Sequence, residues 1–180
     1  MAFTTNHSQA DTGLKAEGNY EVIITSCEEK TNKNDKTSLN ITLTIRNDVE
    51  QKYANGCLFY TAWKAKEPTE YDLAVDGYRY SQIMSISKAA NLPDGKSYKD
   101  LKEFCADLIG KCVLATLKHS EYNGKTYENV QYLNPTKFPD CKHKFKKAAY
   151  QIKEDEFVSI EDTIVDTKTG EVMDEDDMPF

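Results

Sequence analysis

The segment SLNITLTIRN, residues 38–47, decides the fold, because its apolar and polar side chains alternate without interruption. Leu39, Ile41, Leu43 and Ile45 occupy every second position, and polar residues lie between them. This alternation is typical of a β-strand with one face in a core and the other in solvent. The segment therefore predicts a half-buried strand.

Further strands are predicted on both sides of a helical region. β-Branched and aromatic runs predict strands at 18–30 and 57–63, before the helices, and at 111–122 and 125–133, after them. Asn123-Gly124 joins the last two as a type I′ hairpin turn. Apolar residues at helical spacing predict two helices within residues 76–95 and 97–110, the second beginning with a capping box at Ser97 and Asp100 and closed by Gly110.

The order strand, strand, strand, helices, strand, strand is the order of an OB-fold. That fold is a five-stranded Greek-key barrel, here with its helical insertion between strands three and four. Other small folds that combine strands and helices share part of this order. We therefore expect a mainly β, OB-fold-like domain at residues 18–140, with a flexible N-terminal arm at 1–17.

The charge is divided unevenly along the chain. The formal net charge is −7, yet the first 149 residues carry a small positive excess, and the last 31 hold 11 of the 30 acidic residues. The apolar residues of this last part are too sparse to offset the entropy of ordering it. We expect residues 141–180 to form a disordered linker and an acidic tail.

Several functional classes find little support. No P-loop, G-x-G-x-x-G or nucleophile-elbow motif is present, so we expect neither an enzyme nor a bound cofactor. Five widely spaced cysteines indicate reduced, mostly buried thiols, and Cys141 with His143 is too small a set to predict a metal site. The absence of a signal peptide pattern and of any long apolar run leads us to expect a cytoplasmic protein.

The expected ligand face of the barrel combines aromatic rings with cations. In an OB-fold this face lies on strands two and three, between the loops that join strands one to two and four to five. Unpaired bases stack on aromatic rings, and Lys or Arg side chains displace counterions from the phosphates. The expected nucleic-acid-binding residues are Lys33, Lys36, Arg46, Phe59, Tyr60, Trp63, Lys64, Lys118, Tyr122, Lys125 and Tyr127.

Alternation leaves two assignments open on the strand at 57–63. If Tyr60 points into the barrel, Phe59 and Trp63 face outward, and the reverse assignment is nearly as favourable. Lys118 and Lys125, taken singly, are by default solvated surface charges. The sequence therefore does not decide which aromatic rings reach a ligand.

Four segments carry a resemblance to a known family. The terminal DEDDMPF (174–180) resembles the tip of bacterial single-stranded DNA-binding proteins. The body is similar instead to bacteriophage-encoded single-stranded DNA-binding proteins, in GNYEVIITSCEEK (18–30), SLNITLTIRND (38–48) and EYNGKTYENVQYL (121–133). This resemblance implies a location in a bacterial host cell. In that family an acidic tip ending in Pro-Phe docks into basic-rimmed apolar pockets of replication, repair and recombination proteins. The resemblance implies partner binding by Asp174, Glu175, Asp176, Asp177, Met178, Pro179 and Phe180, with Met178 where the family more often has Ile.

We therefore expect a sequence-tolerant single-stranded DNA-binding protein that recruits partner proteins through its tip. The sequence leaves open whether the protein is a monomer or a homo-oligomer. Two alternatives remain at this point. One is a tail-bearing adaptor whose barrel binds another protein, and the other is an acidic mimic of DNA. The sequence does not decide between DNA and RNA.

Overall fold

The computed structural model describes residues 2–7, 10–11 and 13–145. The predicted disorder and partner binding of the acidic tail fall almost wholly on residues 146–180, outside this part of the chain. The elements are β1 (Gly18–Thr31), β2 (Thr37–Ile45), β3 (Cys57–Trp63), α1 (Glu70–Leu73), α2 (Tyr80–Ala89), α3 (Leu101–Leu108), β4 (Cys112–Tyr122) and β5 (Lys125–Pro135). Among the described helices, none is long and apolar enough to cross a bilayer.

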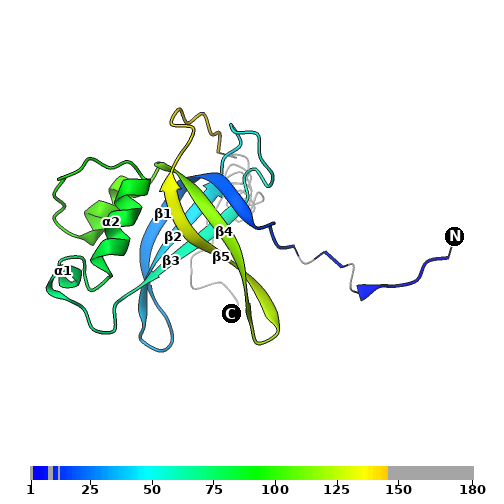
Figure 1. The fold of residues 1–180 in the computed structure, drawn as a ribbon, viewed down its shortest axis with the longest axis horizontal. Coiled ribbons are helices and arrows are strands. Elements are labelled where there is room, and N and C mark those ends of the chain that lie inside the picture. The colour runs from blue at the N-terminus through cyan, green and yellow to red at the C-terminus, as the bar shows by residue number, and fades with distance from the viewer. Residues whose placement is uncertain (1, 8–9, 12, 146–180) are drawn as a thin grey trace, which may run out of the picture. The chain divides into compact units, whose positions relative to one another are not determined.

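The strands form one antiparallel sheet in the order β3-β2-β1-β4-β5, with all three helices inserted between β3 and β4 (Figure 1). The edge strands β3 and β5 approach each other, but the described residues share no ladder between them. The sheet is therefore curved and open at one seam, as in a partly open Greek-key barrel. The predicted fold class is confirmed.

The long strand β1 holds the two halves of the sheet together. Its first residues, Gly18 to Ile23, pair with β4, and the residues from Val22 onward pair with β2. A register shift between Ile24 and Ser26 interrupts the second ladder, and such bulges bend a strand. In Figure 1 the β1–β2 and β4–β5 hairpins extend toward the same side of the sheet.

The core lies on the inner face of this sheet. Leu39, Ile41, Leu43 and Ile45 of β2 are fully buried, as their alternation predicts. Helices α2 and α3 contribute a second layer to the same core, formed by Ile83, Ile86, Ala89, Leu101, Phe104, Cys105 and Leu108. The inner face of β2 is thus apolar, and the polar side chains of this strand lie on its outer face.

Turns and caps agree with the sequence at most positions. Asn123 and Gly124 both have positive φ, as a type I′ turn requires, and Gly110 has φ +86° just after α3. The predicted capping box at Ser97 is wrong, because α3 begins later: Asp100 is its N-cap and accepts a hydrogen bond from the Glu103 amide at 2.9 Å.

The N-terminal arm is shorter than predicted. The Lys15 amide donates a hydrogen bond to Glu128 of β5, and the His119 amide of β4 donates to Glu17 at 2.8 Å. His119 Nε2 also lies 2.7 Å from the Lys15 carbonyl. Residues 15–17 are therefore held against the β4–β5 hairpin, so the ordered domain begins before Gly18.

Candidate nucleic-acid interface

Strand β3 presents Phe59 and Trp63 to solvent on the outer face of the sheet. The exposed fraction is 66% for Phe59 and 51% for Trp63, and Thr61 between them is also exposed. The inward set of Leu58, Tyr60 and Ala62 is buried. The structure thus decides between the two assignments that alternation leaves open, and places two rings about 13 Å apart along one strand.

The surface around these rings is made of short polar side chains. Phe59 pairs with Thr42 of β2 and Trp63 pairs with Ser38. Between them the Thr61 hydroxyl donates to Asn40 Oδ1 at 3.2 Å. Because these neighbours are short and bonded to one another, they leave the ring faces uncovered. We call Phe59, Trp63 and this polar floor the β3 face.

The β4–β5 hairpin carries a second group of rings and cations on one face. Its register pairs Ser120 with Tyr127 and Tyr122 with Lys125, whereas the opposite side-chain set includes the buried Leu117. Tyr122 is 69% exposed, and Tyr127 is partly exposed. The hairpin face is defined here as Lys118, Tyr122, Lys125, Tyr127 and Tyr132.

Tyr132 belongs to the hairpin face, although sequence reasoning missed it. It pairs with Thr116 and is exposed. Simple alternation from Tyr127 and Asn129 would assign Tyr132 to the opposite face, and the shift of the ladder between Thr116 and Leu117 brings it to this one. Its place on the same face as Lys118 follows from the register of the ladder on each side of this shift.

The predicted lysines differ in whether their ammonium groups form ion pairs. Lys33 and Lys36 are exposed in the β1–β2 turn, where Asn32 Oδ1 accepts the Lys36 amide at 3.0 Å and orders the loop. Lys125 is exposed at the hairpin tip. Within the described residues none of these three ammonium groups has a carboxylate within ion-pair distance. Lys118 lies 3.8 Å from Glu17 and remains half-exposed.

Lys64 lies away from the β3 face, contrary to the sequence-based expectation. It follows Trp63 in the chain and therefore points to the opposite side. Its ammonium lies 3.5 Å from Glu29 Oε1 and 5.2 Å from the centre of the Tyr78 ring. The Tyr78 hydroxyl donates to the same Glu29 at 2.8 Å, and burial together with this hydrogen bond raises the pKa of Tyr78. The Lys64 charge is thus paired with Glu29 at the surface, away from the β3 face.

Tyr60 is likewise wrong as a ligand-binding residue. Only 9% of it is exposed, and it packs in the core between β3 and the helices. Its hydroxyl accepts a hydrogen bond from Gln82 Nε2 of α2 at 2.8 Å. A buried phenol that has found a polar partner is an ordinary core residue.

Arg46 is the clearest correction, because it is 0% exposed and cannot reach a phosphate. It holds Asp48 in a two-point contact, with Nε 2.9 Å from Oδ1 and Nη2 2.5 Å from Oδ2. Its other donors reach the Phe138 carbonyl at 2.7 Å, the Asp140 carbonyl at 3.0 Å and the Thr136 hydroxyl at 3.4 Å. All five guanidinium N–H groups therefore have acceptors inside the protein.

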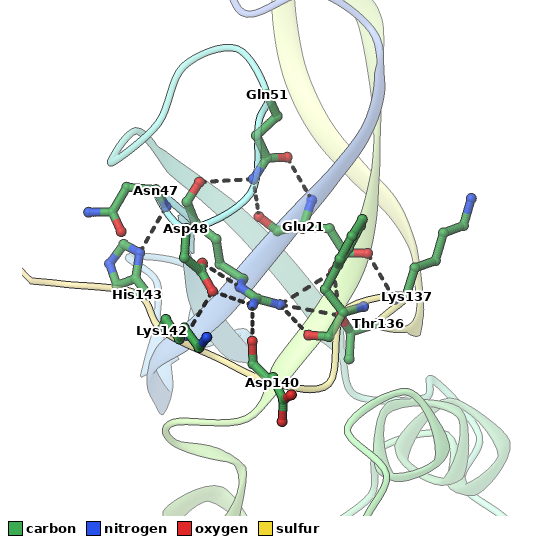
Figure 2. Close-up of polar contacts among 11 residues, drawn as sticks. Glu21, Asn47, Asp48, Gln51, Thr136, Lys137, Asp140, Lys142 and His143 are labelled. Atoms are coloured by element: carbon green, nitrogen blue, oxygen red, sulfur yellow. Dashed lines mark hydrogen bonds and ion pairs between the residues drawn. The ribbon is translucent and has the colours of Figure 1, made fainter.

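Figure 2 shows the surroundings of this guanidinium group, with Glu21, Asp48 and Asp140 converging on it. The Glu21 carboxylate accepts from the Thr136 hydroxyl at 2.5 Å and from the Lys137 amide at 2.9 Å. The Arg46 guanidinium and the Glu21 carboxylate therefore anchor residues 136–140, which follow β5, to the start of β1 and the end of β2. We call this group the Arg46 cluster.

The cysteines and His143 give no metal centre in the described part of the chain, where no three potential ligands are grouped. His143 Nδ1 accepts the Asn47 amide at 3.1 Å, as Figure 2 shows. Burial and a hydrogen bond with Cys141 raise the pKa of Cys112 to about 12. The prediction that the cysteines are mostly buried holds only in part, since Cys57 and Cys141 are exposed.

The predicted nucleic-acid-binding residues thus divide into four groups. Phe59 and Trp63 form the β3 face, the hairpin face holds four predicted residues, and Lys33 with Lys36 occupies the β1–β2 turn. Arg46, Tyr60 and Lys64 serve the interior or its edge. The proposed partner-binding tip, residues 174–180, lies outside the described residues.

Comparison with known proteins gives a family but no activity. A family model described as "Protein of unknown function (DUF669)" matches residues 1–144, a range that contains every helix and strand given above. No curated protein matches the chain. The function therefore has to be argued from the geometry of the surface.

Proposed function

We propose that this chain, which belongs to the DUF669 family of proteins of unknown function, is a sequence-tolerant single-stranded DNA-binding protein. The strand would lie across the outer face of β2 and β3, with bases stacked on aromatic rings and phosphates near the lysines of the two hairpins. The protein makes no use of base-edge recognition in this proposal, because every base offers a π-face for stacking. Its role is to cover and protect single strands.

The exposure of Phe59 and Trp63 on one strand is the observation that carries the proposal. A folded protein gains free energy by burying such rings, so two exposed rings on one sheet face mark a candidate binding surface. The inward neighbours of both rings already fill the core, which leaves the outward pair without a packing role. Stacking of a base on each ring would contribute about 1–3 kcal/mol.

The lysines support the same ligand. Lys33 and Lys36 lie in the turn of the β1–β2 hairpin, whose second strand pairs with β3 and its two rings. Lys118 and Lys125 lie on the hairpin face together with its tyrosines. With about four phosphates contacted, the slope of log affinity against log salt should be near −3. A protein ligand held mainly by apolar contact would show a much weaker dependence on salt.

Fluorescence anisotropy with a labelled oligo-dT tests the proposal. We expect binding at low salt, and a loss of about 5-fold to 100-fold in affinity for Trp63→Ala or Phe59→Ala. Tyr71→Ala is the matched control, because Tyr71 is an equally exposed ring on α1, away from β3. Equal losses in all three variants, or no binding by the wild type at low salt, would overturn the proposal.

The tip supplies the second half of the proposed role. Its support is the sequence alone: four acidic residues followed by Met178, Pro179 and Phe180. We propose that these side chains recruit replication and recombination proteins to the bound strand. Acidic side chains and the terminal carboxylate would meet Arg or Lys of the partner, and the Phe180 ring would fill an apolar pocket.

A further inference from the structure

Two cysteines far apart in the chain face each other between the sheet and a helix. Cys27 lies on β1 and Cys105 on α3, 78 positions later, and their sulfur atoms are 3.0 Å apart. Both are free thiols. A disulfide bond is about 2.05 Å long, so the two atoms would have to close by about 1 Å to become linked. The two sulfur atoms therefore already lie close to bonding distance.

A small pocket gives access to these thiols. Its volume is about 380 Å³, and Cys27, Cys105, Leu101, Ala106 and Ile109 are among the side chains that line it. Cys27 is half-buried and Cys105 is buried, so neither sulfur is freely exposed to bulky reagents. A molecule of the size of a peroxide can enter such a pocket, whereas a protein cannot.

The hydrogen bond between the two thiols shifts their pKa values in opposite directions. The bond from Cys27 lowers the pKa of Cys105, because it stabilises the Cys105 thiolate. The same bond, together with burial, raises the pKa of Cys27. The thiolate is the reactive form of cysteine, so Cys105 is the sulfur that attacks first and Cys27 is the one that resolves the product.

We propose that Cys27 and Cys105 are a redox-active pair that closes to a disulfide when hydrogen peroxide enters this pocket. The Cys105 thiolate attacks one peroxide oxygen, the O–O bond breaks, and the departing hydroxide takes up a proton to become water. Cys105 is then a sulfenic acid. The Cys27 sulfur attacks the Cys105 sulfur, the S–S bond forms, and the S–O bond breaks. The hydroxide leaves with the Cys27 proton as a second water.

The balance of the reaction is complete. Two thiols lose two electrons and two protons, and one peroxide molecule is reduced to two waters. A small thiol reductant reverses the step by exchange. This matches how disulfides occur in reducing compartments, where they are transient rather than structural. The inference does not rest on DNA binding.

The cross-link would fasten α3 to β1. It joins residues 78 positions apart, and closing a long loop removes conformational freedom from the unfolded chain. We expect the melting temperature of the oxidised protein to exceed that of the reduced protein by about 5–15 °C. Adding a thiol reductant should reverse the rise.

Peptide mapping provides the test, because trypsin places each cysteine in a different peptide. The peptides are 16–30 for Cys27, 53–64 for Cys57, 103–111 for Cys105, 112–118 for Cys112 and 138–142 for Cys141. The full chain is treated with hydrogen peroxide and then unfolded in denaturant with N-ethylmaleimide, so that every remaining thiol is blocked. It is then digested with trypsin and analysed by mass spectrometry. We expect peptide 16–30 linked to peptide 103–111, and loss of the linked species after reduction.

Two variants keep the proposal falsifiable. Cys57→Ser removes the exposed thiol of β3 and should leave the link intact, whereas Cys105→Ser should abolish both the link and the rise in melting temperature. The proposal is overturned if peroxide-treated wild type gives peptides 16–30 and 103–111 that are each blocked singly. It is also overturned if Cys27 is linked to Cys57 instead.

Discussion

Arg46 shows how the surroundings of one residue determine its role. In the sequence it continues the polar set of the strand at 38–47, which makes it a candidate phosphate ligand. In the structure β2 ends at Ile45, and the next side chain turns into the protein. The acceptors that hold it there include Thr136, Phe138 and Asp140, about 90 residues later in the chain. No local pattern contains that information.

Replacing Arg46 should therefore lower the stability of the fold and leave the affinity for single-stranded DNA unchanged. Arg46→Met leaves Asp48 and Glu21 as buried carboxylates without their cation, which should lower the free energy of unfolding by about 3–5 kcal/mol. Urea denaturation measures the change. Arg79→Met is the matched control, since Arg79 is the only other arginine and is exposed; it should change stability by less than about 0.5 kcal/mol. A stable Arg46→Met protein with weakened oligo-dT binding would restore the phosphate-binding role.

Asp48 makes the stability of the Arg46 cluster depend on pH. The hydrogen bonds from Arg46 lower the pKa of this carboxyl below its ordinary value of 3.8. The unfolded state therefore binds more protons than the folded state in acid, so the stabilisation is complete above about pH 5 and is lost as pH falls through the lowered value. The gap in urea midpoint between wild type and Asp48→Asn should shrink from pH 5 to pH 3. Asp140→Asn, which keeps the carbonyl that Arg46 uses, should show no such narrowing.

At the scale of the element, strand β3 shows what alternation can and cannot predict. Its bounds, Cys57–Trp63, agree with the predicted strand. Period two also establishes that Phe59 and Trp63 share a face, but which face is inward is a single binary choice that the strand itself leaves open. That choice follows from the register with β2, in which Tyr60 pairs with the fully buried Ile41.

Adjacent alanine substitutions separate the two faces of β3. Tyr60→Ala should destabilise the fold by about 3–5 kcal/mol, because it empties a core position and leaves Gln82 without its acceptor. Phe59→Ala should cost less than about 1 kcal/mol of stability and should instead weaken oligo-dT binding. Thermal unfolding and anisotropy on the same preparations measure both effects. If Phe59→Ala lost stability and Tyr60→Ala lost only oligo-dT binding, the assignment of the two faces would be wrong.

The predictable elements are those with a strong period or a distinctive turn. Strand β2, the Asn123-Gly124 hairpin and the apolar face of α3 follow from local sequence. The four-residue helix α1 carries too few residues to show a period, and the shift that places Tyr132 on the hairpin face is a property of two paired strands. Long-range contacts decide such features, so a single segment cannot predict them.

At the scale of the whole molecule, the charge is divided between a nearly neutral part that matches the family and an acidic end. The family match covers residues 1–144, whereas 11 of the 30 acidic residues fall after residue 149. A DNA mimic would act through that end. A single-strand binder would act through the aromatic faces, and its acidic end would compete weakly with DNA for the lysines.

Deleting residues 172–180 distinguishes these accounts. We expect oligo-dT affinity to be unchanged or higher in the truncated protein, by up to about 10-fold at low salt, because a competing polyanion has been removed. Full-length protein with Phe180→Ala, which keeps every acidic side chain of the tip, should match the wild type in this assay. A DNA mimic would not bind oligo-dT, and truncation would abolish its binding to a partner protein while Trp63→Ala would keep that binding. This result would favour the mimic.

The most direct measurement uses Trp63 itself, since it is the only tryptophan in the chain and is half-exposed on the β3 face. Unlabelled oligo-dT is titrated into the wild-type protein while the indole fluorescence is recorded. The account predicts saturable quenching with the same midpoint as anisotropy, because bases stack on the indole ring. Binding detected by anisotropy with no change in Trp63 fluorescence would contradict the claim that single strands lie on this face.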